Sequence, residues 1–149
     1  MNTIITFEIA KLIKEKGFDV ECNKYYEYAL TSRKNEEDGY SGSFGWKKGE
    51  LNLQSGYFIN NHSKIDNSNS SWLLCSAPTI AEVVMWLYEK HGIWVVVNIG
   101  KPHLVKSCMF YANIIKFGIH HKNKHRTIFV NTPTEAYLSA IEHTLNNLI

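Results

Sequence analysis

The sequence has few cysteines and no pairing pattern among them. Cys22, Cys75 and Cys108 are the three in the chain, and they show neither a C-x-x-C motif nor the Cys/His spacing of a zinc finger. An odd number of isolated cysteines does not make a disulfide framework, and free thiols are typical of proteins in a reducing cytosol. We therefore expect three free thiols.

An excess of charge of one sign is also missing. The 16 Lys and Arg residues nearly balance the 14 Asp and Glu residues, so the formal net charge is +2 at pH 7. A balance this mild does not make nucleic acid or an anionic membrane an obligatory partner. No apolar run approaches the roughly 18 residues of a membrane helix, and the first residues lack the features of a secretory signal peptide. We expect a cytoplasmic protein with no membrane partner.

Motifs of known catalytic or phosphate-binding sites are absent. None of the nine glycines falls into G-x-x-x-x-G-K or G-x-G-x-x-G, and there is no G-x-S-x-G nucleophile elbow. Cys75 and Cys108 lie in apolar stretches, where a thiol is more typical of an inert core residue than of a nucleophile. The sequence therefore assigns no catalytic residue and no cofactor, and a small hydrolase remains the third functional alternative.

The size and composition that are present indicate one globular domain. The chain has 149 residues, of which 44% are hydrophobic and 20% charged, enough to bury a core without metal or disulfide staples. Four Trp, eight Tyr and seven Phe must be taken up by the core or by an interface. We expect a single domain over 1–149, with mobile surface loops near 31–48 and 60–71, where polar turn-forming residues dominate.

Three helices have recognisable ends, and the segments between them are typical of strands. The predicted cap residues are Thr6 and Gly17 for the first helix, Thr79, Glu82 and Gly92 for the second, and Thr132, Pro133 and Glu135 for the third. Runs such as YYEYAL, ELNL, GYFIN and SWLLC predict short strands before the second helix. After it, IWVVVNI, SCMFYANIIKFGI and RTIFV predict three consecutive strands.

The predicted fold class is therefore α+β. Its parts, in chain order, are an N-terminal helix, a hairpin region, a buried central helix, a three-stranded antiparallel meander, and a C-terminal helix packed on the sheet.

The central helix has almost no polar side between Ile80 and Tyr88. A helix that is apolar all round must be covered on more than one side. We favour cover by the sheet and the first helix within one molecule. The alternative is an interaction surface in which Met85 and Trp86, on the side away from Val84 and Tyr88, meet a protein partner or a second copy in a homodimer.

Three blocks of the chain carry a resemblance. They are KEKGFD at the end of the first helix, SAPTIAEVVMWLYEKHGIWV, and the terminal TPTEAYLSAIEHTLNNLI. In these blocks the chain resembles a family of small uncharacterised proteins of gut anaerobic bacteria and their phages. The resemblance implies a cytosolic accessory protein carried by mobile elements. It implies no activity and no site residue, because the matching residues are helix caps and packing positions.

The stretch HHKNKHR gathers histidines and cations between two predicted strands. Its members are His120, His121, Lys122, Lys124, His125 and Arg126. A metal site would use the three histidines, with His103 as a fourth ligand, but the neighbouring cations oppose a divalent ion. We favour a hairpin loop, HKNK, whose Asn123 tolerates positive φ and whose charges keep a sheet edge soluble. No metal is predicted.

The same hairpin, 116–126, gives an alternative function as a weak patch for single-stranded nucleic acid. The residues of this patch are Lys116, Lys122, Lys124 and Arg126, with Tyr111 and Phe117 as stacking rings. So few cations give little affinity in a chain with 14 acidic residues. A non-enzymatic protein-interaction or accessory module is therefore the first functional expectation, and the nucleic-acid patch is the second.

Overall fold

The computed structural model describes residues 3–32, 46–58, 71–101, 108–117 and 123–149. Their elements, in chain order, are α1 (Phe7–Glu15), β1 (Cys22–Ser32), β2 (Trp46–Phe58), β3 (Ser71–Ser76), α2 (Ile80–His91), β4 (Ile93–Gly100), β5 (Met109–Lys116), β6 (Asn123–Arg126) and α3 (Pro133–Asn147). The strands form two antiparallel sheets, so the predicted α+β class is confirmed. The loops predicted near 31–48 and 60–71 fall mostly outside the described residues.

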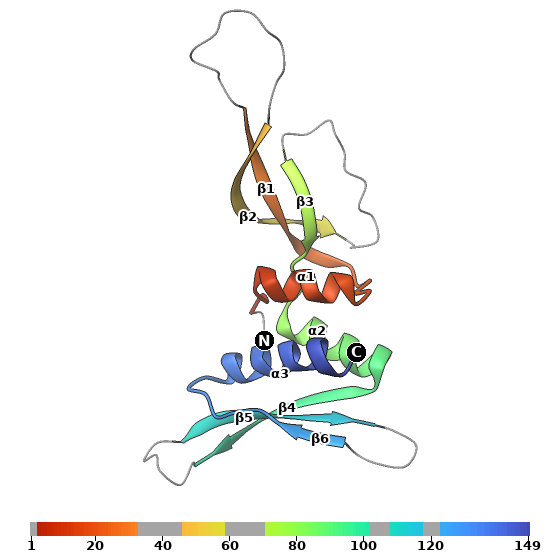
Figure 1. Ribbon diagram of the computed structural model, residues 1–149, viewed down its shortest axis with the longest axis vertical. Helices are drawn as coiled ribbons and strands as arrows, with labels where there is room; N and C mark the ends of the chain where they lie inside the picture. The colour runs from red at the N-terminus through yellow and green to blue at the C-terminus, as the bar shows by residue number, and fades with distance from the viewer. Residues whose placement is uncertain (1–2, 33–45, 59–70, 102–107, 118–122) are drawn as a thin grey trace, which may run out of the picture.

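The helices lie between the two sheets. Figure 1 shows α2 and α3 over one face of the β4-β5-β6 sheet, with α1 between them and the sheet of β1, β2 and β3. The contacts agree with this view, because α3 packs on β4 and β5, and α1 packs on both β3 and α3. Among the described elements in Figure 1, no helix covers the other face of the β4-β5-β6 sheet.

The first sheet has the order β2-β1-β3. The runs ELNL and GYFIN, which we expected as separate strands, belong largely to the single strand β2. The residues between them stay extended and pair with β1, Lys24 with Ser55 and Tyr25 with Gln54. The hydroxyl of Tyr26 donates a hydrogen bond to the carbonyl oxygen of Ile5 at 2.7 Å and ties this sheet to the chain before α1.

The second sheet is the predicted meander, with the order β4-β5-β6. Its third strand is displaced from the prediction, since β6 covers Asn123–Arg126 and not RTIFV. The ladder ends at Thr127, whose hydroxyl accepts the amide of Ala112 at 2.8 Å, and Ile128 then points outward with 76% of its surface exposed. After Ile128, an isolated bridge between Phe110 and Val130 continues the pairing.

All three helix starts match the prediction. The Thr6 hydroxyl accepts from the amide of Ile9, and complete capping boxes open α2 at Thr79 and α3 at Thr132. Gly92 ends α2 with φ +63°, a left-handed conformation that glycine adopts without strain. Local sequence signals therefore fix the residue at which each helix begins.

One hydrophobic cluster runs through the described parts of the chain. It includes side chains from α1, α2, α3, the second sheet and the inner end of the first sheet. Phe18, which follows α1, and Trp86 of α2 meet edge to face in this core, with ring centroids 5.3 Å apart. No helix among the described residues is long and apolar enough to cross a membrane.

Candidate interaction surface

Helix α2 turns one apolar side inward and another outward. Val83 and Leu87 are fully buried, whereas Met85 and Tyr88 keep 44% and 47% of their surface exposed. Residues three apart lie on the same side of a helix, so Met85 and Tyr88 form one exposed stripe. Neighbouring large apolar side chains that remain exposed are a common feature of interaction sites.

Trp94 and Phe117 extend this stripe onto the second sheet. The Tyr88 and Trp94 rings meet edge to face, with centroids 5.1 Å apart. Phe117 directly follows β5 and is 50% exposed, and its amide donates to the carbonyl oxygen of Gly92 at 3.0 Å. Together Met85, Tyr88, Trp94 and Phe117 line a hollow of about 350 Å³. We call these four residues the α2–β4 surface.

The prediction that Trp86 shares a surface with Met85 is wrong. Trp86 is 2% exposed, and its ring meets those of Phe18 and His91 edge to face. Each residue along a helix turns by about 100°, which carries Trp86 from the exposed side into the core. The expectation that Tyr88 lies on the side away from Met85 is also wrong. Three residues make nearly one full turn of the helix, which returns Tyr88 to the side of Met85.

The predicted nucleic-acid patch is divided between two faces of the second sheet. Successive side chains of a strand point to opposite faces, so Tyr111 lies on the face away from α3, whereas Lys116 lies on the face under α3. The Lys116 ammonium donates to the carbonyl oxygen of Leu148 at 2.9 Å, at the end of α3. Lys116 therefore does not join Tyr111 in one patch, and Phe117 lines the hollow beside α2.

Arg126 does meet an aromatic ring of that patch. Its guanidinium lies 3.8 Å from the ring centroid of Tyr111 and 4.7 Å from that of Phe129. The cation occupies a ring face on which a base would stack. Of the remaining predicted cations, Lys124 belongs to β6 and Lys122 lies outside the described residues.

Only His125 of the predicted histidine cluster falls within the described residues; His103, His120 and His121 do not. The His125 ring stacks on that of His143 in α3, with centroids 3.9 Å apart and planes within 4°. Burial, with a smaller effect of His125, lowers the pKa of His143, which favours the uncharged ring. Within the described ranges no group of three His, Cys, Asp or Glu side chains could hold a metal.

The buried thiols are poorly suited to nucleophilic chemistry. Burial, with a smaller effect of Glu82, raises the pKa of Cys22 to about 12, and burial raises that of Cys75 to about 11. The thiolate is the attacking form of cysteine, and pKa values this high keep both groups protonated at neutral pH. Neither thiol therefore supports the hydrolase alternative.

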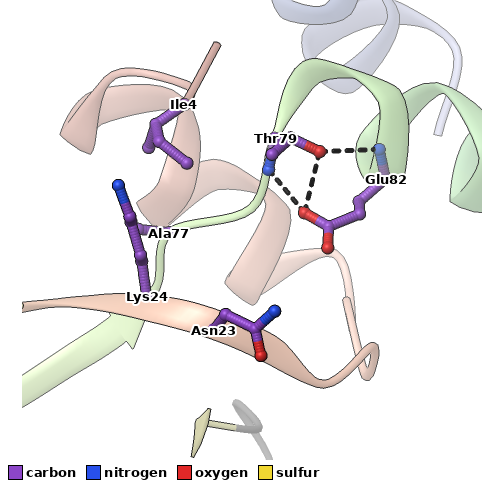
Figure 2. Close-up of a pocket in the computed structure, with 6 residues that line it drawn as sticks. All are labelled: Ile4, Asn23, Lys24, Ala77, Thr79 and Glu82. Carbon is purple, nitrogen blue, oxygen red and sulfur yellow. Dashed lines mark hydrogen bonds between the residues drawn. The ribbon is translucent and has the colours of Figure 1, made fainter. Parts of the chain in front are cut away.

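A second hollow, of about 400 Å³, lies where β1 passes the start of α2 (Figure 2). Its lining residues are Ile4, Asn23, Lys24, Ala77, Thr79 and Glu82. Thr79 and Glu82 are engaged in the capping box, in which one carboxylate oxygen of Glu82 accepts from the Thr79 amide at 2.6 Å and from its hydroxyl at 2.9 Å. The acid thus stabilises a helix start.

Comparisons with known proteins found no match among protein-family models, curated proteins or solved structures. The function of this chain must therefore be inferred from its own geometry. Within that geometry, sequence reasoning found Met85 and Phe117 for separate reasons but did not join them, and it missed Tyr88 and Trp94. The three-residue spacing of Met85 and Tyr88 is the signal that could have placed both on one side of the helix.

Proposed function

We propose that the protein is a non-enzymatic accessory module of the cytoplasm that binds a partner protein through the α2–β4 surface. The observation that carries this proposal is the exposure of Met85, Tyr88 and Phe117 side by side around one hollow. Aromatic residues and Met are enriched at the centres of protein interfaces, where they fill pockets of the partner or accept its side chains. The resemblance to small uncharacterised proteins of gut anaerobic bacteria and their phages would imply an accessory protein, which is the same class of function.

The chemistry of the hollow favours an apolar side chain of the partner as its occupant. Three of its four lining residues are aromatic, and the fourth is a methionine, whose flexible thioether adapts to different shapes. A volume of about 350 Å³ accepts one or two large side chains, such as those on the apolar face of an amphipathic helix.

The proposal is tested by affinity capture from the source cells, with the tagged wild type and a Met85→Gln/Tyr88→Gln double variant as baits. Gln keeps helix propensity while it removes the apolar stripe. The expected result is a protein captured by the wild type and lost with the double variant. The control is Ile128→Gln, which removes an exposed apolar side chain that does not line this hollow and should leave capture unchanged.

Cross-linking then identifies the contact itself. A photoreactive residue at position 85 should link to the captured protein, and one at position 128 should not. Equal capture by the wild type and the double variant, with both folded by circular dichroism, would contradict the proposal.

Nucleic-acid binding is the second candidate, since the helix-free face of the second sheet carries Tyr111 with the Arg126 cation above it. Proteins that bind single strands use sheet aromatics as stacking platforms. Fluorescence anisotropy with labelled oligonucleotides at low salt separates the two functions. An anisotropy that rises on addition of the wild type and stays constant on addition of Arg126→Ala would favour this candidate over the first.

A further inference from the structure

Strand β4 is an outer strand of its sheet and lacks the features that usually protect an edge. Of the segment IWVVVNIG, Ile93–Gly100, no residue is charged and none is proline. Natural proteins place lysine, proline or a bulge on exposed edges to prevent pairing with another chain. The opposite outer strand follows this rule, because β6 is four residues long and contains Lys124 and Arg126.

The register shows which backbone groups of β4 face outward. The amide of Phe117 donates to the carbonyl oxygen of Gly92, and this pair continues the ladder in which Trp94 pairs with Ile115. Hydrogen-bonded pairs alternate with non-hydrogen-bonded pairs in an antiparallel ladder. Even-numbered residues of β4 therefore bond to β5, and the N–H and C=O groups of odd-numbered residues point to the free edge.

Four residues thus present their backbone groups along this edge: Ile93, Val95, Val97 and Ile99. In the part of the chain that the structure describes, no residue outside β4 pairs with these groups. They offer eight hydrogen-bonding groups in a row on an uncharged strand. This arrangement is a template for strand addition.

We propose that β4 pairs with β4 of a second copy of this chain, antiparallel and about a two-fold axis at Val96, so that the two sheets join into one of six strands. The strand is self-complementary in this register. Ile93 pairs with Ile99 of the second copy and Val95 pairs with Val97 of the second copy, so aliphatic side chains meet on one face. A two-fold contact uses the same patch on both molecules, as such a strand pair requires.

The pairing also accounts for an exposed side chain that the single chain leaves unexplained. Ile99 is 66% exposed although it continues the apolar face that begins with buried Ile93. In the proposed dimer, Ile99 lies beside Ile93 of the second copy and is removed from water. The small net charge of +2 adds little repulsion between the copies.

This inference is independent of the proposed function, because it depends on the backbone edge of β4 and not on the α2–β4 surface. Light scattering after size exclusion measures the mass directly. The expected mass of the wild type is twice 17.2 kDa. Val97→Pro removes an outward N–H that the ladder with β5 does not use, and Ile99→Lys puts a charge on the edge.

Both variants should give the single-chain mass. Two controls should keep the dimer: Ile128→Lys, which charges another exposed isoleucine, and the Met85→Gln/Tyr88→Gln variant, which removes the α2–β4 surface. A wild type that stays at 17.2 kDa up to millimolar concentration would overturn the inference. So would a dimer that survives both edge variants.

The register has its own test by disulfide formation. At the two-fold axis the two Val96 residues form a non-hydrogen-bonded pair with Cα atoms about 4.5 Å apart, which suits a disulfide. Both cysteine variants are made in a Cys108→Ser background. Val96→Cys should cross-link the dimer on oxidation. Asn98→Cys should not, because the two-fold axis places the two copies of residue 98 several residues apart along the paired strands. Cross-linking at 98 but not at 96 would contradict this register.

Discussion

At the scale of single residues, neighbours in the sequence have opposite surroundings. Met85 is among the exposed apolar residues, and Trp86 is among the largest buried ones. Both are large and apolar, and between Ile80 and Tyr88 the one charged residue of α2 is Glu82. Composition therefore could not decide which of the two faces the core, because the direction depends on where β4 and α3 pack against α2.

Two histidines should make the free energy of unfolding depend on pH. Burial lowers the pKa of His143 and that of His91, with smaller effects from His125 on the first and from Lys116 and Lys90 on the second. Each ring therefore binds a proton more weakly in the folded protein than in the unfolded chain, where the pKa is about 6.5. The free energy of unfolding should fall as the pH is lowered through and below about 6.5.

We expect the His143→Gln variant to lose less of its Tm than the wild type between about pH 7.5 and about pH 5.5. Nuclear magnetic resonance titration provides the direct measurement, and it should place the pKa of His143 below that of a free histidine. In His125→Gln the pKa of His143 should rise, because the neighbouring charge is gone. Parallel loss of Tm in the wild type and His143→Gln would show that this ring does not couple to folding.

At the scale of elements, the helices could be predicted from the sequence and the strand ends could not. Helix starts depend on local signals, such as the hydroxyl of Thr79 and the carboxylate three residues later, and these act in the same way in any fold. The extent of β2 depends on pairing with β1 across a long connection, and the end of β6 depends on the hydroxyl of Thr127. Neither contact leaves a pattern in the strand itself.

The α2–β4 surface could not be predicted from the sequence for the same reason. Met85 and Phe117 are far apart in the sequence, and they meet only because the register of β4 and β5 brings Phe117 to Gly92. The apolar pattern of one helix identified Met85, and a basic hairpin suggested Phe117. The strand register that joins them is a property of the folded sheet.

The capping box of α2 gives the prediction at this scale. Thr79→Ala removes the oxygen that accepts the Glu82 amide and should lower the free energy of unfolding by about 1 kcal/mol, up to about 2. Thr79→Ser keeps that oxygen and should remain close to the wild type. Urea denaturation measures both. If alanine and serine give the same midpoint, the hydrogen bonds of the box do not contribute to stability.

At the scale of the whole molecule, the two sheets depend on one core. The cluster that contains Ile13 and Phe18 near the first sheet also contains Ile114 of β5, with α2 and α3 between them. Two sheets do not have to unfold separately, because helices that pack between them can couple the unfolding of one sheet to that of the other. We therefore expect the chain to unfold as a single domain.

Trp86→Ala tests this coupling, because Trp86 lies in that core against Phe18. Removing a buried Trp side chain costs about 3–5 kcal/mol. If the core is one unit, hydrogen exchange should show this loss both at β1 amides and at β5 amides. The exposed Met85→Ala on the same helix should change the free energy of unfolding by less than about 0.5 kcal/mol at either place. A loss confined to one sheet would mean that the sheets belong to separate folding units and that the helices do not transmit stability between them.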